Sequence, residues 1–93
     1  MYSDEALVDF ERIIEFLLQT WREIATQTLT NIQSAVGILE THPLIGRRIE
    51  GHIRELVISQ RATGYLALYR FDAAFDVVRI LRIRHQREAG YTT

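Results

Sequence analysis

The spacing of apolar residues changes near residue 42 from a helical period to a strand period, and this change limits the folds open to the chain. Between residues 6 and 40, apolar side chains recur at steps of three and four, as on one face of a helix. After residue 52 they form short runs rich in β-branched and aromatic residues, as in strands. Helices that precede strands predict an α+β fold, with an N-terminal antiparallel helical hairpin packed on one face of a small sheet.

The first helix is predicted over residues 4–19. Ser3 is a suitable N-cap, and Asp4 and Glu5 place negative charge in the first turn, where the helix dipole favours it. Asp9 is expected on the side that faces solvent. The apolar residues expected to face the core share one side of the helix and are Leu7, Phe10, Ile14, Leu17 and Trp21, with Ala6, Ile13 and Leu18 beside them.

The second helix is predicted over residues 21–40, because Thr20 and Glu23 have the spacing of a capping box. Pro43 disfavours helix at the residue before it, and the glycines that follow permit turns. Two such helices joined by a tight turn form an antiparallel hairpin that shares one apolar seam. The apolar positions of the second helix repeat at helical period and are Ala25, Leu29, Ile32, Val36 and Leu39.

Three strands are predicted, over residues 53–59, 65–71 and 76–84, with the turn segments SQRATG and DAAFD between them. They predict a small, mainly antiparallel sheet of three to four strands. With 93 residues, the chain is expected to form a single domain, residues 1–93, around one core. The aromatic residues expected in that core or at its rim are Trp21, Tyr65, Tyr69 and Phe71.

The composition argues against several classes of protein. The chain has no cysteine and three histidines far apart in the sequence, so we expect no disulfide, no metal site and no cofactor. It lacks a signal peptide and any apolar run long enough to span a membrane, which predicts a soluble, cytoplasmic protein without a membrane partner. A pI near 6.3 and the absence of a recognition motif argue against direct DNA binding by this chain alone.

Charge is divided unevenly along the chain. Residues 1–46 hold seven acidic residues and two arginines, whereas residues 47–93 hold nine arginines and five acidic residues. All eleven basic residues are arginine, whose planar, always-charged guanidinium suits carboxylate or phosphate. The C-terminal segment RILRIRHQREAGY is therefore predicted to bind an acidic partner. Its candidate binding residues are Arg79, Arg82, Arg84, His85, Arg87 and Tyr91.

The order of these elements resembles that of the ParE/RelE superfamily of type II toxins, and more specifically its ParE-like, plasmid-stabilisation branch. The resemblance covers nearly all of residues 4–91 and is most specific in the segments PLIGR, REL, YLALYR and IRHQR. It implies a toxin that arrests growth and is neutralised by a cognate antitoxin, which places a helix in a hydrophobic groove and adds a strand to the sheet.

One departure from the family pattern concerns the N-terminus. Family members usually begin with a strand, whereas only Met1–Ser3 precede the first predicted helix here. Either the start of the chain is assigned too late, or the sheet lacks an edge strand and its unpaired backbone groups invite another chain.

The resemblance implies two different activities, because ParE-type members act on DNA gyrase and RelE-type members cut mRNA at the ribosome. For RNA cleavage, His85 is the candidate acid or base. Arg87 and Arg54 are the candidates for binding phosphate. Tyr91 is the candidate for stacking on a base or donating a proton.

Other positions argue against the nuclease. RelE-type members carry lysines on the second strand and an arginine soon after the GY of the third, where this chain has Val57, Ser59 and Leu66. We therefore expect no catalytic residue and predict a toxin that binds and poisons a target protein, most simply DNA gyrase. Two alternatives stay open: a ribosome-dependent mRNA endoribonuclease of RelE type, and a degenerate, non-toxic member that only binds antitoxin. A homodimer and a hetero-oligomer with the antitoxin are both compatible with the sequence.

Overall fold

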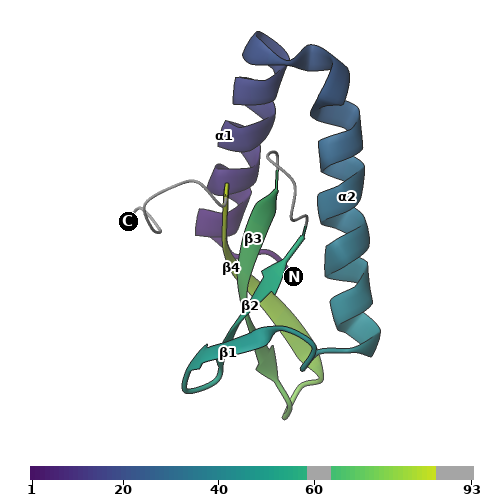
Figure 1. Cartoon of the computed structure of the whole chain (residues 1–93). Coiled ribbons are helices and arrows are strands. Elements are labelled where there is room, and N and C mark those ends of the chain that lie inside the picture. Colours follow the sequence, from purple (N-terminus) through teal and green to yellow (C-terminus); the bar gives the residue numbers. More distant parts are fainter. Residues whose placement is uncertain (59–63, 86–93) are drawn as a thin grey trace.

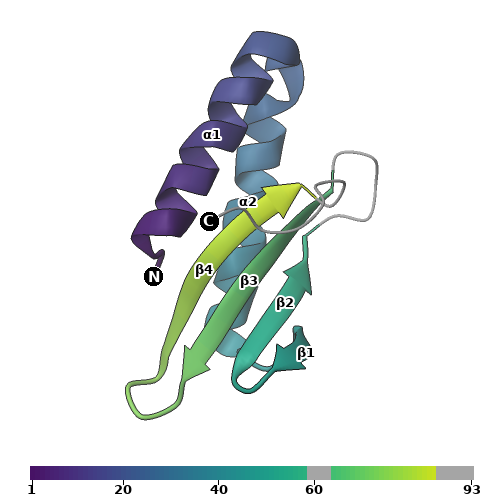
Figure 2. The ribbon, with the colours of Figure 1, turned by 90° about the vertical axis from the view of Figure 1, so that its left-hand side faces the viewer.

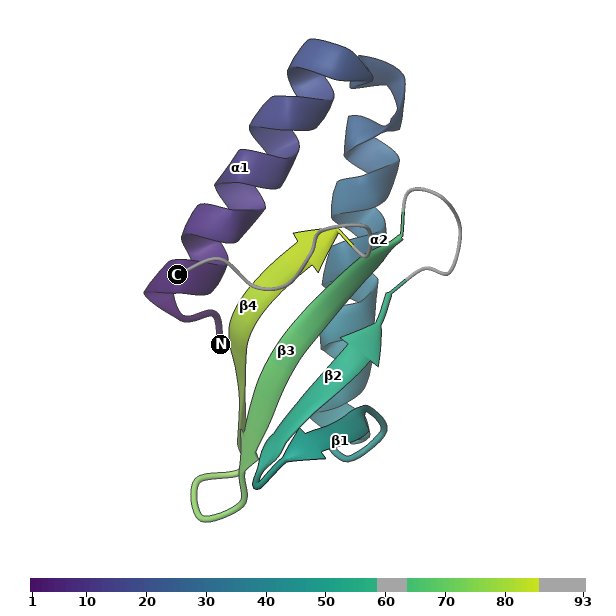
Figure 3. The same cartoon turned by 60° about the vertical axis from the view of Figure 1, so that its left-hand side comes forward.

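The computed structural model describes residues 1–58 and 64–85 (Figure 1). An N-terminal helical hairpin is followed by strands that pair antiparallel in the order β1-β2-β3-β4. Figures 2 and 3 show α2 behind the sheet and α1 beside β4, so that both helices leave the opposite face uncovered. The expected α+β class is confirmed. The elements are α1 (Asp4–Thr20), α2 (Arg22–Thr41), β1 (Arg47–Glu50), β2 (Ile53–Val57), β3 (Tyr65–Asp72) and β4 (Val77–His85).

The strand β1 has no counterpart in the three predicted strands. Only one of its four residues, Ile49, is apolar, so it gives no strand pattern. Gly46 precedes this strand, and its backbone lies close to the Tyr69 side chain: the Gly46 nitrogen donates to the Tyr69 hydroxyl at 2.8 Å. Gly51 makes the turn into β2 with a φ of 54°, in the left-handed region that glycine adopts readily.

The buried side of α1 differs from the predicted one. Ala6, Asp9, Ile13 and Leu17 are buried, whereas Leu7 is 48% exposed. The predicted stripe is therefore only partly correct, because Leu17 is buried and Phe10 and Ile14 are half-buried, while the centre of the buried side is shifted by one residue. The prediction for Asp9 is wrong, since its side chain faces the protein interior rather than solvent. The physical reason is that α1 is apolar on more than one side, so periodicity alone does not select the side that packs.

The predicted helix ends are partly correct. Ser3 is the N-cap of α1, and its hydroxyl accepts a hydrogen bond from the Ala6 nitrogen at 3.0 Å. The capping box at Thr20 is wrong, because Thr20 still belongs to α1 and the N-cap of α2 is Trp21, with no side-chain hydrogen bond. Trp21 is 51% exposed at the tip of the hairpin, so its expected place in the core is also wrong.

The core lies between the helices and one face of the sheet. Each large apolar side chain that is fully buried there contributes about 1.5–3 kcal/mol to the free energy of unfolding. Four of the five positions predicted on α2 are buried, and Thr28 is buried in place of Leu29. The largest fully buried residues of the described part are Tyr69, Ile32, Leu39, Ile80 and Ile83.

The outer edge of β4 is covered by the N-terminal residues. Tyr2 forms a parallel bridge with Ile80, in which the Ser3 nitrogen donates to the Ile80 oxygen at 2.8 Å and the Ile80 nitrogen donates to the Met1 oxygen at 2.7 Å. The Tyr2 ring packs edge-on against Phe10, and burial raises the pKa of the Tyr2 hydroxyl above its usual value of 10.0. The sequence left open a sheet edge with unpaired backbone groups, and this expectation is wrong where residues 1–3 bond to β4.

Candidate binding surfaces

A bulge in β4 gathers the arginines of this strand on one face of the sheet. Arg82 pairs with Leu68 and Ile80 pairs with Tyr69, which leaves Leu81 as an extra residue. Because side chains alternate along a strand, one extra residue reverses the alternation, so Arg79 shares a face with Arg82 and Arg84. Ile80 and Ile83, on either side of the bulge, both face the core and are fully buried.

We call the sheet face away from the helices the open face (Figures 2 and 3). Its side chains form rows across the strands, because residues that pair in register point the same way. One row runs from Arg82 through Leu68 and Glu55 to Arg47, and the next contains Arg79 and Arg70. Most arginines of the open face therefore lie on the outer strands β4 and β1, and Arg70 lies on the inner strand β3.

Arg82 is held by a buried carboxylate of α1. Asp9 is 3% exposed and accepts hydrogen bonds from Arg82 Nε at 2.7 Å, Arg82 Nη2 at 3.0 Å and the Ile83 nitrogen at 2.9 Å. A bidentate, charge-assisted pair of this kind is strong and directional. The geometry therefore assigns Arg82 to fastening α1 onto β4, and its binding of a partner stays a prediction.

Asp9 is the important residue that sequence reasoning missed. The only signal in the sequence is its position, three residues after Ala6 and four before Ile13, within what proves to be the buried stripe. A second arginine, Arg12, lies 3.9 Å from the same carboxylate, and its own side chain is 48% exposed.

The end of β4 contains the other described candidates. Arg84 Nη1 donates to the His85 oxygen at 3.2 Å. The His85 ring packs edge-on against Tyr65, with 5.2 Å between ring centroids. Arg87 and Tyr91 lie outside the described residues.

Arg54 lies toward the other end of the sheet. It pairs with Tyr69 in β3, whereas His85 pairs with Tyr65, so the two positions differ by four residues along that strand. At about 3.3 Å per residue this is a separation of about 13 Å along the strand. Arg54 Nη1 donates to the oxygens of Leu44 at 3.1 Å and Gly46 at 2.9 Å. The two nuclease candidates in the described part are thus not brought together.

A groove of about 580 Å³ runs along the helical hairpin. Figure 1 shows this hairpin extending beyond the sheet. The apolar residues of the groove come from α1 and α2, and Glu11, Glu15 and Gln19 also line it. A groove with this lining suits the apolar face of another helix. Its apolar residues are Phe10, Ile14, Leu18 and Leu29.

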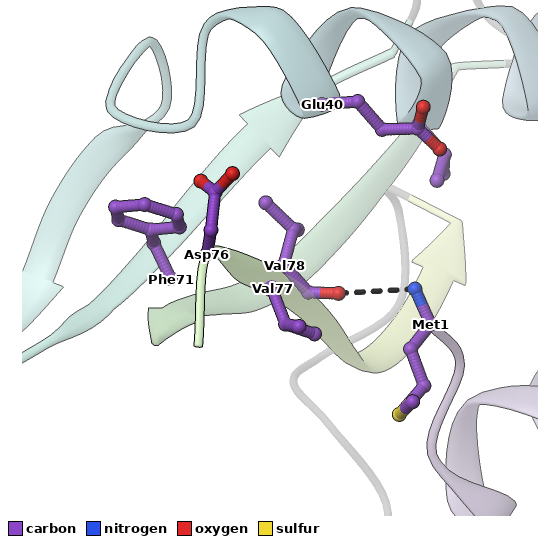
Figure 4. A pocket seen from close by; sticks show the side chains of 7 residues that line it. Met1, Glu40, Phe71, Asp76, Val77 and Val78 are labelled. Atoms are coloured by element: carbon purple, nitrogen blue, oxygen red, sulfur yellow. Dashed lines mark hydrogen bonds between the residues drawn. The ribbon is translucent and has the colours of Figure 1, made fainter. Parts of the chain in front are cut away.

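A smaller pocket of about 360 Å³ lies between α2 and the start of β4 (Figure 4). Glu40 and Asp76 each provide a carboxylate, and Val36, Phe71, Val77 and Val78 provide apolar surface. The Met1 nitrogen donates to the Val78 oxygen at 3.0 Å. In residues 1–58 and 64–85, no three His, Cys, Asp or Glu side chains are grouped as a metal would require. No helix in the same residues is long and apolar enough to cross a bilayer.

Comparison with known proteins identifies the family. The sequence model of the protein family described as the ParE toxin of the type II toxin-antitoxin system parDE matches residues 1–90. The protein called Toxin RelE3 of Caulobacter vibrioides is 35% identical over 80 residues, which cover 86% of this chain and 85% of the relative. The order of elements and these matches agree, and the chain belongs to the ParE/RelE family of type II toxins.

Proposed function

We propose that this toxin arrests growth by binding and poisoning a target protein, DNA gyrase, rather than by cutting RNA. The observation that supports this most is the separation of Arg54 from His85 along the sheet. Cleavage of RNA requires an acid or base and the cations that stabilise the phosphorane to surround one phosphate. Arg54 instead binds backbone oxygens of the link between α2 and β1.

A second candidate function is ribosome-dependent cleavage of mRNA. It is favoured by the name of the relative, Toxin RelE3, and by His85 at the end of an arginine-rich strand. Under this alternative, His85 acts as acid or base and Arg87 binds phosphate.

Membership of the family implies a cognate antitoxin, and we propose that a helix of it occupies the groove on the hairpin. Helix-in-groove binding buries apolar surface that α1 and α2 otherwise leave to solvent. Addition of a strand along β4 has less room, because residues 1–3 and Asp9 already bond to its outer edge. The backbone groups of β4 bonded in this way belong to Val78, Ile80, Leu81 and Ile83.

The test is to purify the toxin free of antitoxin and titrate it into two assays. The first follows supercoiling by gyrase and its cleavage complexes, and the second follows mRNA integrity on programmed ribosomes. Inhibition of gyrase with intact mRNA supports the proposal. Codon-positioned cuts that disappear in the His85→Ala variant establish the nuclease instead. The Arg54→Ala variant is the control, since the geometry predicts that it leaves any such cuts in place.

A further inference from the structure

Two arginines stand directly opposite each other on the open face. Arg70 on β3 pairs in register with Arg79 on β4, and Ile53 on β2 is the next member of the row. Cβ atoms of such a pair lie about 4.5–5.5 Å apart, and like charges at this distance destabilise a sheet. Arg70 is exposed and Arg79 is half-buried. The sequence therefore places two positive charges where strand pairing disfavours them.

The neighbouring row shows that this chain can neutralise such arginines. Arg47 bonds to Glu55 at 3.0 Å, and Arg82 bonds to Asp9 at 2.7 Å. Neither arginine of the opposed pair has a salt bridge in the described ranges, 1–58 and 64–85. The contact of Arg79 Nη1 is with Met1 Sδ at 3.3 Å, and a thioether is a weak, uncharged acceptor. A local rule that is broken, with no compensating charge among the residues that the structure describes, is typical of a functional site.

The chemistry of the pair selects an anion. Two arginines at adjacent positions on a sheet suit a carboxylate or a phosphate, because each of these anions accepts bidentate hydrogen bonds from a guanidinium. A nucleic acid presents a row of phosphates, and these would meet Asp72 on the same face of β3 and Glu50 in the same row on β1. The formal net charge of the chain is −1, which also disfavours a polyanion. A single carboxylate avoids both penalties.

We infer that Arg70 and Arg79 form an anchor for one acidic side chain of the cognate antitoxin, on the open face of the sheet. This inference rests on the proposed function in one respect only, that the partner is an antitoxin. It does not depend on gyrase or on RNA cleavage. The anchor lies on a different surface from the groove of the helical hairpin, so the antitoxin contacts both faces of the toxin.

The test compares the Arg70→Glu and Arg79→Glu variants with an Arg22→Glu control. Arg22 is exposed in the first turn of α2, away from the sheet, so its reversal changes the net charge equally without touching the anchor. Affinity for the purified cognate antitoxin is measured by calorimetry at 50 mM and 500 mM NaCl, and thermal unfolding is measured on each free toxin. The expected loss of affinity at low salt is roughly 10- to 100-fold for each anchor variant, and no loss for the control.

Stability separates a binding role from a structural one. Arg70→Glu replaces a like-charge pair with an opposite-charge pair, so the Tm of the free toxin should rise by about 1–5 °C while affinity falls. The difference in affinity should also shrink at 500 mM NaCl. Replacement of one acidic residue of the antitoxin by Arg should restore binding to Arg70→Glu.

Three results would overturn the inference. Antitoxin affinity that is unchanged in both anchor variants removes the anchor. If the anchor variants lose Tm as free toxins as well as affinity for antitoxin, the arginines stabilise the fold and are not kept for binding. Unchanged antitoxin affinity with lost binding of a single-stranded oligouridylate probe assigns the pair to phosphate. Because none of these measurements uses gyrase, a toxin that fails to inhibit gyrase still tests the anchor.

Discussion

The replacement Asp9→Asn tests whether α1 is fastened to β4 by the carboxylate. The side chain is 3% exposed and receives three hydrogen bonds, two from Arg82 and one from the Ile83 nitrogen. An amide removes the charge and turns one acceptor atom into a donor that faces other donors. Breaking a buried ion pair costs about 3–5 kcal/mol, and the 18% exposure of the Arg82 side chain lowers this to about 2–4 kcal/mol.

That loss is large against the free energy of unfolding of a 93-residue domain, which is about 5–14 kcal/mol. The assay is urea unfolding followed by far-UV circular dichroism. The control is Glu15→Gln, an exposed carboxylate on the same helix, which should change the free energy of unfolding by less than about 0.5 kcal/mol. A double-mutant cycle with Arg82→Met should give a coupling of about 1.5–3 kcal/mol. A cost below 1 kcal/mol for Asp9→Asn, or effects of the two replacements that simply add, would refute the reasoning.

Three further predictions concern other parts of the fold. In the same urea assay, Gly46→Ala should lower the free energy of unfolding by about 1–3 kcal/mol, because the new Cβ would lie 2.6 Å from the Tyr69 side chain. Gly37→Ala is the control: its new Cβ lies in open space on α2, so the free energy of unfolding should rise by about 0.5–1 kcal/mol. Burial raises the pKa of Tyr2, so its contribution to stability is present below pH 10 and is lost as pH rises through the folded pKa; Tyr2→Phe should lack this part of the decline in unfolding curves taken above pH 10. Leu18→Glu, in the groove, should weaken antitoxin binding roughly tenfold or more in calorimetry while circular dichroism stays unchanged.

The class of fold follows from the sequence because the change of period is a strong signal. A helix of 17 residues and one of 20 residues bury a repeating set of side chains, and turns separate the strands that follow. The strand β1 escapes prediction because pairing with β2, rather than its own side chains, makes it a strand. The side of α1 that packs escapes prediction because Leu7, Val8 and Phe16 are apolar and exposed. Periodicity reports that a helix is amphipathic, but not which of two apolar sides meets the sheet.

The candidate site was predictable as a set of residue types and not as an arrangement. Arg79, Arg82 and Arg84 share a face only because Leu81 is a bulge, and no glycine marks that bulge in the sequence. The opposed position of Arg70 depends on the register of two strands, which the sequence does not state. Non-local pairing of this kind decides which charges meet, and composition cannot supply it.

The arginines of the C-terminal half do not all make the same kind of contact. Arg82 joins β4 to a buried carboxylate of α1, whereas Arg79 faces Arg70 with no salt bridge in the part of the chain that the structure describes. Reversing Arg82 and Arg84 together would lower the free energy of unfolding along with any affinity, and a growth assay would not separate the two effects. Reversing Arg70 avoids this difficulty, because stability is expected to rise while affinity falls. If Arg70 is kept for binding at a cost in stability, its replacement changes stability and antitoxin affinity in opposite directions. If its role is structural, its replacement lowers both.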